Sequence, residues 1–264
     1  MSSLAEALSS GRVEVIVVCN CCTDDTAAIA ATFPGVQVLS LPVASKVAAL
    51  NAGDDIASKW PRVYLDADVD LPSVSLRQTL ERLSEPYGPL CARPTFTYDT
   101  AGATKSVEAY YRARDKMLGT RSAMWGAGIY AVNQRGHERL GSFPEIINDD
   151  LLIDRLFIGH EKQIVDGHPV RVRTPRNSRA LLATLGRTYR GNAEQSGGAT
   201  STTVKQLVMT IRGLGSARDA AIYAAFALVG RGISFVSSGW GTDFTSRQPA
   251  SSGLRSQPGV FGRR

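Results

Sequence analysis

The stretch Val63-Tyr64-Leu65-Asp66-Ala67-Asp68-Val69-Asp70 passes from apolar residues directly into alternating carboxylates. The apolar run predicts a buried strand. Unpaired carboxylates are unstable in a core, so the aspartates mark the carboxyl end of that strand, where parallel α/β sheets bind ligands. Side chains alternate along an extended chain, so Asp66 and Asp68 are expected on one side. Such oxygen ligands suit Mg²⁺ or Mn²⁺ completed by waters and phosphates, although an acidic loop without a ligand is the alternative interpretation.

The composition describes a globular chain of 264 residues with 43% apolar content, enough for one large or two small domains. The formal net charge is +6 and the pI is about 9.3. This excess suits an anionic small substrate, an acidic membrane surface or solubility alone. No basic block carries interleaved aromatic residues, so nucleic acid is not an expected partner. A mild concentration of positive charge includes Arg171, Arg173, Arg176, Arg179, Arg187 and Arg190.

The cysteines and the apolar segments bear on the compartment. Cys19, Cys21 and Cys22 crowd at one predicted strand end, unlike the spaced pairs of a zinc site. Without a signal-peptide pattern, free thiols in the cytoplasm are expected. No apolar run reaches the ~20 residues that span a bilayer. The apolar segment 220–229 is expected to form a helix that packs on the domain or lies at the cytoplasmic face of a membrane.

Strands and helices alternate through the first part of the chain. Strands are expected over 13–18, 36–41 and 62–65, with helices over 24–32 and from 45 onward. This alternation requires right-handed crossovers and predicts a mostly parallel sheet flanked by helices. The loops after Val18 and after Leu65 then open at one edge of the sheet, which favours a nucleotide site there.

The rest of the chain continues the alternation. Helices are expected over 72–83 and 106–117, with a strand over 90–96 between them. Gly126 and Gly128 precede another strand and permit close backbone approach. Residues 148–150 precede a further helix, and a later helix carries the segment 187–192. The segment from 237 onward is rich in Ser, Gly, Arg, Pro and Gln and is expected to be disordered.

Five segments, in this order, resemble the motifs of family-2 glycosyltransferases with the GT-A fold. They are Val15 to Thr26, similar to the family's Asp/Asn-Gly-Ser-Thr-Asp segment; Lys46-Val47-Ala48-Ala49-Leu50-Asn51-Ala52-Gly53, similar to Lys-x-x-Ala-Leu-Asn-x-Gly; Asp66-Ala67-Asp68, similar to the metal-binding Asp-x-Asp; Gly126 to Val132 with Asn148-Asp149-Asp150, similar to the acceptor-side strand and Glu-Asp motif; and Arg187-Thr188-Tyr189-Arg190, loosely similar to Gln-x-x-Arg-Trp. The resemblance covers roughly residues 11 to 195, and the ordered combination is more specific than any one motif.

The resemblance implies transfer of a sugar from a nucleotide diphosphate donor to an acceptor hydroxyl, with inversion at the anomeric carbon. Asp66 and Asp68 would hold the divalent cation against the diphosphate. Asp149 is the first choice for the base and Asp150 the alternate. The implied donor-binding residues are Asn20, Asp24, Lys46, Asn51, Asp66, Arg187 and Arg190, and the implied acceptor-side residues are Trp125, Gly126 and Gly128. The residues do not specify the sugar, the base or the acceptor, which is a glycan, a lipid or a small molecule.

Each assignment has a structural alternative. The alternative for Asp149 and Asp150 is that they merely cap a helix. Arg187 and Arg190 would also suit a solvated helix face. The alternative for Asn51 is an ordinary buried residue that forms hydrogen bonds. The alternative for Lys46 is an exposed lysine on a helix, and the alternative for Trp125 is a residue that anchors the core or a loop.

Two departures from the family pattern matter. Members begin with a strand that ends in Pro-x-x-Asn-Glu and lies centrally in the sheet, and no such stretch precedes Val13; Cys19 and Cys21 also stand where Asp and Gly are common. Without that strand, two unpaired sheet edges, a gap and a poorly stable or poorly active chain are expected. The expected organisation is therefore an N-terminally shortened GT-A domain over 1–200, helices over 201–236 and a tail over 237–264. The rival functions are a non-catalytic remnant of such a domain and a nucleotidyltransferase.

Overall fold

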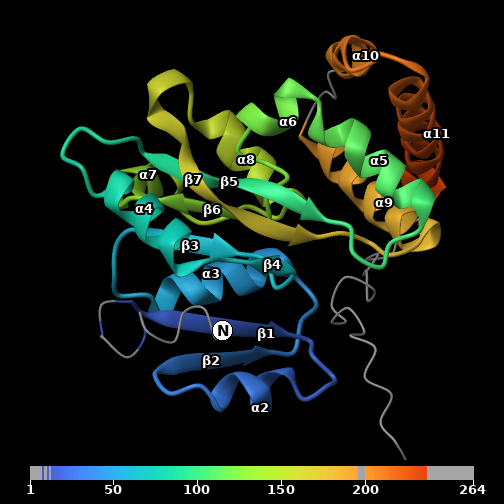
Figure 1. The fold of residues 1–264 in the computed structure, drawn as a ribbon. Helices are drawn as coiled ribbons and strands as arrows, with labels where there is room; N and C mark the ends of the chain where they lie inside the picture. The colour runs from blue at the N-terminus through green and yellow to red at the C-terminus, as the bar shows by residue number, and fades with distance from the viewer. Residues whose placement is uncertain (1–7, 9–10, 12, 196–199, 237–264) are drawn as a thin grey trace, which may run out of the picture.

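The computed structural model describes residues 8, 11, 13–195 and 200–236. A two-stranded sheet and a five-stranded sheet lie side by side, with helices around them (Figure 1). The strands are β1 (Val15–Asn20), β2 (Val36–Leu41), β3 (Arg62–Leu65), β4 (Val69–Asp70), β5 (Cys91–Asp99), β6 (Ile129–Val132) and β7 (Lys162–Arg173). The helices are α2 (Thr26–Ala31), α3 (Lys46–Ile56), α4 (Ser73–Leu83), α5 (Lys105–Asp115), α6 (Leu118–Ser122), α7 (Gln134–Leu140), α8 (Asp149–Leu156), the 3-10 helix η2 (Gly159–Glu161), α9 (Ser178–Glu194), α10 (Thr200–Met209) and α11 (Leu214–Val236).

The smaller sheet pairs β1 with β2 in parallel, from Val15 opposite Val36 to Asn20 opposite Leu41. Helix α3 packs on β1 through Gly53, where an added Cβ would lie 3.4 Å from the Val18 side chain. The expected cap of α3 is confirmed, because the Ser45 hydroxyl accepts a hydrogen bond from the Ala48 amide at 3.1 Å.

The larger sheet has the order β3-β6-β5-β7-β4. Of the adjacent pairs in this sheet, β5 and β7 are parallel, whereas β3 pairs with β6, β6 with β5 and β4 with β7 in antiparallel fashion. The expected α/β class with flanking helices is confirmed, and the sheet is more mixed than the sequence suggested. The reason is that β6 pairs antiparallel with both of its neighbours, β3 and β5, and β4 pairs antiparallel with β7.

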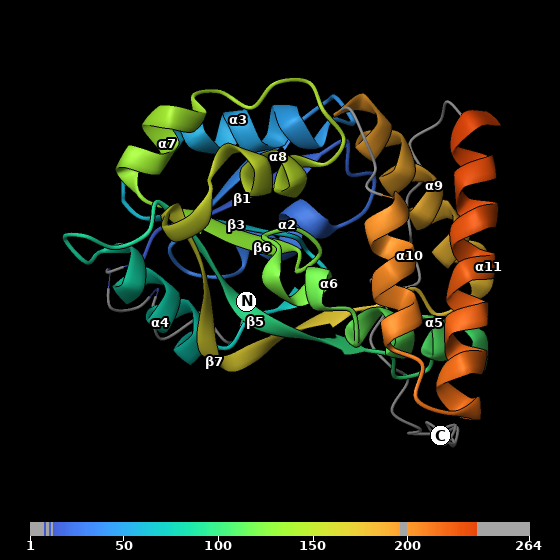
Figure 2. The same cartoon turned by 90° about the horizontal axis from the view of Figure 1, so that it is seen from above.

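Helices cover both faces of the larger sheet. Seen from above, α3, α7 and α8 lie on one side of it and α4 lies on the other (Figure 2). The apolar cluster between the sheet and the first group contains Tyr64, Tyr130, Phe143, Ile153 and Phe157. This cluster fixes the position of α8, whose first turn carries the Asp149-Asp150 pair.

The C-terminal helices form a separate group with α5 and α9 (Figure 2). Tyr223 of α11 stacks on Tyr110 of α5 with ring centroids 4.8 Å apart, and Phe226 packs against the same cluster. The segment 220–229 thus has a packed face, while Leu228 and Val229 are exposed. None of the described helices is long and apolar enough to cross a bilayer. The predicted disordered tail, 237–264, lies outside the described residues.

The sheet is interrupted between β1 and β3. Each of these strands has a ladder partner on one edge only within the described residues, β2 for β1 and β6 for β3. The side chains of Val15 and Val63 nevertheless pack against the same apolar cluster. In the described part of the chain, side-chain packing therefore joins the two sheets where no ladder hydrogen bonds do.

Candidate active site

The site lies at the end of β3, in a cleft of about 1860 Å³ that reaches the ends of β1 and α8. The Asp66 amide donates to the Gly128 carbonyl at 2.8 Å, and Val69 donates back to the Asp66 carbonyl at 3.2 Å. Residues 66–69 therefore form a turn. The expectation that Asp66 and Asp68 project from one extended strand is wrong in this detail, although both residues line the cleft.

Lys46 joins two segments of the site that are distant in sequence. Its Nζ lies 2.8 Å from Asp66 Oδ1 and 2.7 Å from Asp149 Oδ1. Burial lowers the pKa of Lys46, but the Asp66 and Asp149 carboxylates outweigh burial and raise it above its ordinary value. Lys46 is thus a charged bridge across the cleft, and the alternative of an unpaired exposed lysine is wrong.

Asp68 lies in a strongly charged environment. Burial and the neighbouring Asp66 carboxylate raise its pKa to about 6, while Lys46 and Arg187 oppose this increase. Arg187 of α9 is therefore close enough to act on the Asp-x-Asp turn. Arg187 and Arg190 both line the cleft.

Asp149 is almost completely buried, at 2% exposure. It accepts a hydrogen bond from the Tyr130 hydroxyl at 2.8 Å, in addition to its ion pair with Lys46. Burial raises the pKa of Tyr130 well above its ordinary value, so the phenol remains the donor. With two strong donors on its oxygens, Asp149 holds Lys46 and is poorly suited to accept a further proton.

Asp150 differs from its neighbour. Its Oδ2 accepts a hydrogen bond from the Gly126 amide at 2.8 Å. Burial and the charge of Asp149 raise the pKa of Asp150 to about 6, against the opposing effect of Lys46. Neither carboxylate caps its own helix, because Asn148 is the N-cap residue and no side-chain cap bond forms. The helix-capping alternative is therefore wrong for both.

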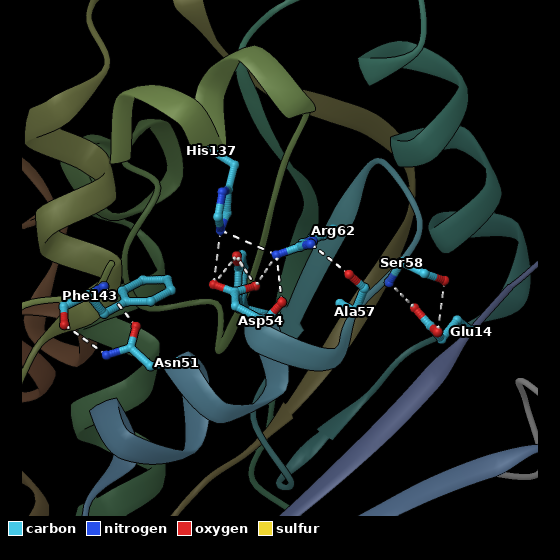
Figure 3. Close-up of polar contacts among 9 residues, drawn as sticks. Glu14, Asn51, Asp54, Ala57, Ser58, Arg62, His137 and Phe143 are labelled. Atoms are coloured by element: carbon cyan, nitrogen blue, oxygen red, sulfur yellow. Dashed lines mark hydrogen bonds and ion pairs between the residues drawn. The ribbon is translucent and has the colours of Figure 1, made fainter. Parts of the chain in front are cut away.

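Helix α3, which carries Lys46, is fixed by two sets of polar contacts (Figure 3). Asn51 exchanges hydrogen bonds with the Phe143 backbone, at 3.0 Å to the carbonyl and 2.8 Å from the amide. Asp54 accepts from Arg62 at 3.0 Å and contacts His137 Nε2 at 3.0 Å. Asn51 therefore has the contacts of a positioning residue that ties α3 to the segment before α8.

The remaining donor-side residues lie at the end of β1. Asn20 lines the cleft, and Cys21 after it has a positive φ of 55°, which turns the chain sharply. The Asp24 carboxylate accepts hydrogen bonds from the amide and hydroxyl of Thr26 at 3.1 and 2.5 Å. Asp24 thus shapes the loop that leads into α2.

Gly128 and Trp125 have different surroundings. Gly128 has a φ of +62°, and an added Cβ would lie 2.6 Å from Val69 and 3.4 Å from Asp66. Gly128 therefore permits the close approach that positions Asp66. Trp125 lines the cleft with Arg114, whose guanidinium carbon is 5.6 Å from the indole centroid.

Sequence reasoning missed Tyr130 and Asp154. Asp154 accepts from the Met124 amide and Lys162, each at 2.8 Å, and so holds the loop before Trp125. Tyr130 belongs to the quoted acceptor-side strand, whose four residues are all buried, and a tyrosine hydroxyl within a buried apolar strand was the available signal. These contacts link β6, α8 and β7, which are distant in sequence, so no local sequence pattern predicts them.

Taken together, an acidic strand end, a bridging lysine and a second carboxylate pair form the candidate active site of an α/β enzyme. The sequence profile described as Glycosyl transferase family 2 matches residues 1–138. The chain therefore belongs to glycosyltransferase family 2 and is a glycosyltransferase.

A solved structure shares the fold. It is described as "Mannosyltransferase PcManGT from Pyrobaculum calidifontis in complex with GDP-Man and Mn2+", with 18% identity and a TM-score of 0.52 over 88% of this chain and 70% of that one. The likeness shows the GT-A type of fold. A sequence comparison with curated proteins gave no match.

Proposed function

We propose that the chain transfers a sugar from a nucleotide diphosphate sugar to an acceptor hydroxyl, with inversion at the anomeric carbon. The observation that carries the proposal is the Lys46 bridge, which brings Asp66 and Asp149 within 2.8 Å and 2.7 Å of one ammonium group. This bridge joins the strand end suited to a diphosphate with the carboxylates suited to an acceptor. A donor complex with Mn²⁺ in the structural neighbour supports the donor class.

The donor side would use residues from three elements. Asn20 would contact the nucleotide, and Lys46, Arg187 and Arg190 would balance phosphate charge, because guanidinium and ammonium groups suit phosphate oxygens. All four line the cleft. We keep Asp24 in this set only as the residue that shapes the loop beside Asn20.

Asp66 and Asp68 fit a divalent cation. No cluster of three or more His, Cys, Asp or Glu ligands converges in the described ranges. Mg²⁺ and Mn²⁺ sites of this type need only one or two carboxylates, with waters and phosphates completing the shell. Burial and, after it, the Asp66 carboxylate raise the pKa of Asp68, and a bound cation would favour the ionised form of both carboxylates. When bound, the cation would offset charge on the diphosphate leaving group.

The base for the acceptor hydroxyl is Asp150 in this proposal, in preference to Asp149. Asp150 has a single hydrogen-bond donor, the Gly126 amide, and a pKa raised to about 6. A base works best when its pKa lies near the working pH. Asp149, held by Lys46 and Tyr130, would keep the lysine in position.

The test is calorimetry with Mn²⁺ and a panel of UDP-, GDP- and TDP-sugars, followed by transfer assays with the donor that binds. Saturable binding of one donor, lost with Asp68→Asn, is expected. A folded protein that binds no donor would favour the non-catalytic remnant. Release of pyrophosphate from a nucleoside triphosphate and a sugar phosphate would instead identify a nucleotidyltransferase.

We further propose contact with an anionic membrane surface through α10 and the turn after it. Exposed apolar side chains gather there, namely Val204, Val208, Met209, Ile211 and Leu214. Lys205, Arg212 and Arg218 add positive charge, with no acidic residue between 200 and 218. Apolar and basic side chains together suit an interfacial helix. The exposed thiols of Cys21 and Cys22 favour a reducing, cytoplasmic side.

A further inference from the structure

Arg114 of α5 lines the cleft on the side of Trp125, among aromatic rings. Its Nε donates to the Tyr98 hydroxyl at 2.8 Å. Within the part of the chain that the structure describes, this is its only hydrogen bond, and no carboxylate forms an ion pair with it. A guanidinium in such apolar surroundings is costly without an anionic partner.

Two other arginines of this chain have several hydrogen-bond acceptors around their guanidinium groups. Arg93, 1% exposed, donates to the backbone carbonyls of Ala123, Pro94 and Arg121 at 2.8, 2.9 and 3.0 Å. Arg112, on the same helix as Arg114, makes a two-pronged contact with Asp219 at 2.9 Å. Arg114 has neither a carbonyl cage nor a carboxylate.

A second polar group in the same aromatic cluster is also incomplete. The Tyr110 hydroxyl is buried and has no hydrogen-bond partner among the described residues, although Tyr110 lines the cleft. Burial raises the pKa of Tyr110 well above its ordinary value, with Arg114 opposing, so the two groups interact and the phenol keeps its proton. A neutral phenol beside a guanidinium offers two kinds of donor to one anion.

Arg114, and with it the Arg114–Tyr110 pair, lies near the proposed base, Asp150. An added Cβ at Gly126 would lie 3.3 Å from an Arg114 Nη2 atom. The amide of the same Gly126 donates to Asp150 at 2.8 Å. The Arg114 guanidinium and the Asp150 carboxylate therefore both lie beside Gly126. One small acceptor can contact both groups.

From this geometry we propose that Arg114 binds an anionic group of the acceptor, so that the acceptor is a hydroxyl compound that carries a phosphate or a carboxylate. This inference rests on the proposed function and names its substrate class. The rings of Tyr98, Tyr111 and Trp125 line the cleft around the guanidinium and would contact the rest of the acceptor. Arg114 is a binding and specificity residue in this account, and Asp150 remains the base.

The test measures binding of two matched pairs by calorimetry, each at saturating Mn²⁺ and nucleoside diphosphate: glycerol 3-phosphate against glycerol, and glucuronate against glucose. The wild-type protein should bind the charged member of at least one pair at least tenfold more tightly. Arg114→Gln should remove this preference, and Arg114→Lys should retain part of it. Arg121→Gln removes an arginine that is 63% exposed and should leave the preference unchanged.

Three results would overturn the inference: equal binding of charged and neutral members, no binding of any member, or a preference that survives Arg114→Gln. Circular dichroism and melting temperature confirm that each variant is folded. Donor binding in the same calorimeter separates the two proposals. If donors bind and the anions do not, this inference fails alone; if no donor binds, the proposed function fails as well.

Discussion

Asp150 is partly buried and, among the described residues, accepts one hydrogen bond, from the Gly126 amide, as suits a general base. Asp150→Asn keeps the shape and removes the proton acceptor, so kcat should fall by about 10²–10⁴-fold. Donor affinity should change little, because the donor contacts come from other residues. Asp166→Asn, at an exposed position of β7, is the matched control and should retain full activity. Transfer rates for both variants, measured beside donor calorimetry, provide the check; wild-type turnover of Asp150→Asn would refute the assignment.

The raised pKa of Asp150 also predicts a pH dependence. An ordinary aspartate has lost its proton well below pH 5, whereas burial and Asp149 keep Asp150 protonated up to about 6. Only the ionised form accepts a proton, so kcat/KM should rise about tenfold per pH unit below that value and level off above it. A rate profile from pH 4.5 to 8 measures this. A flat profile over that range would contradict a base with a raised pKa.

At the residue scale, sequence reasoning found the groups whose chemistry is local. The Asp66-Ala67-Asp68 turn and the Asp149-Asp150 pair stand out because carboxylates directly follow or precede apolar elements. The sequence favoured Asp149 over Asp150 as the base. The contacts of Asp149 with Lys46 and Tyr130, which lead us to propose Asp150 instead, arise only when α3, β6 and α8 pack together. Arg114 was missed because an arginine in an amphipathic helix gives no sign of its partners.

Among the elements, the Gly126–Gly128 loop has the tightest packing requirement. Gly128→Ala would bring a Cβ to 2.6 Å from Val69 and force Asp66 to shift. Gly141, with a similar φ of +63° and no atom within 4 Å, is the control for backbone strain alone. Both alanine variants should lose about 1–3 kcal/mol of unfolding free energy from that strain, and Gly128→Ala about 2 kcal/mol more from overpacking. Urea unfolding measures the loss, and only Gly128→Ala should also weaken binding of Mn²⁺ with donor.

Helix α10 and its following turn predict a lipid-dependent behaviour. Val208 and Leu214 are 59% and 93% exposed, so Val208→Asp with Leu214→Asp removes apolar area and adds negative charge without disturbing a core. Flotation with anionic phosphatidylglycerol vesicles should recover the wild-type protein and lose the double variant. Ile29→Asp, at an equally exposed apolar position of α2, should still float. Equal recovery of all three proteins would argue against this surface.

The boundaries of helices and strands could be predicted from the sequence where apolar residues recur at regular spacing or form an uninterrupted run. The strands over 36–41 and 62–65 were predicted to the residue, and helix α4 ended at the expected Leu83. The direction of β6 was not predicted, because an apolar run specifies burial and says nothing about which neighbour it pairs with. The mixed sheet is therefore a property of tertiary packing.

For the molecule as a whole, the proposed donor site spans the interruption between the two sheets, with Asn20 at the end of β1 and Asp66 directly after β3. A ligand that contacts both should stabilise the chain by about 2.7 kcal/mol at a hundred times its Kd. Mn²⁺ with the matching nucleotide sugar should accordingly raise the melting temperature by a few degrees. Free sugar should have no effect, and EDTA should abolish the shift. An unchanged melting temperature at saturating donor would exclude a site that joins the sheets.

The facing edges of β1 and β3 have a consequence for how the protein behaves in solution. Among residues 13–195 and 200–236 no strand pairs with these edges, so each offers a row of backbone amides and carbonyls that another extended chain can match. At high concentration, copies of the molecule should therefore add strands to one another, giving oligomers whose abundance grows with time and warmth. A short β-branched peptide that occupies either edge would be expected to suppress this self-association.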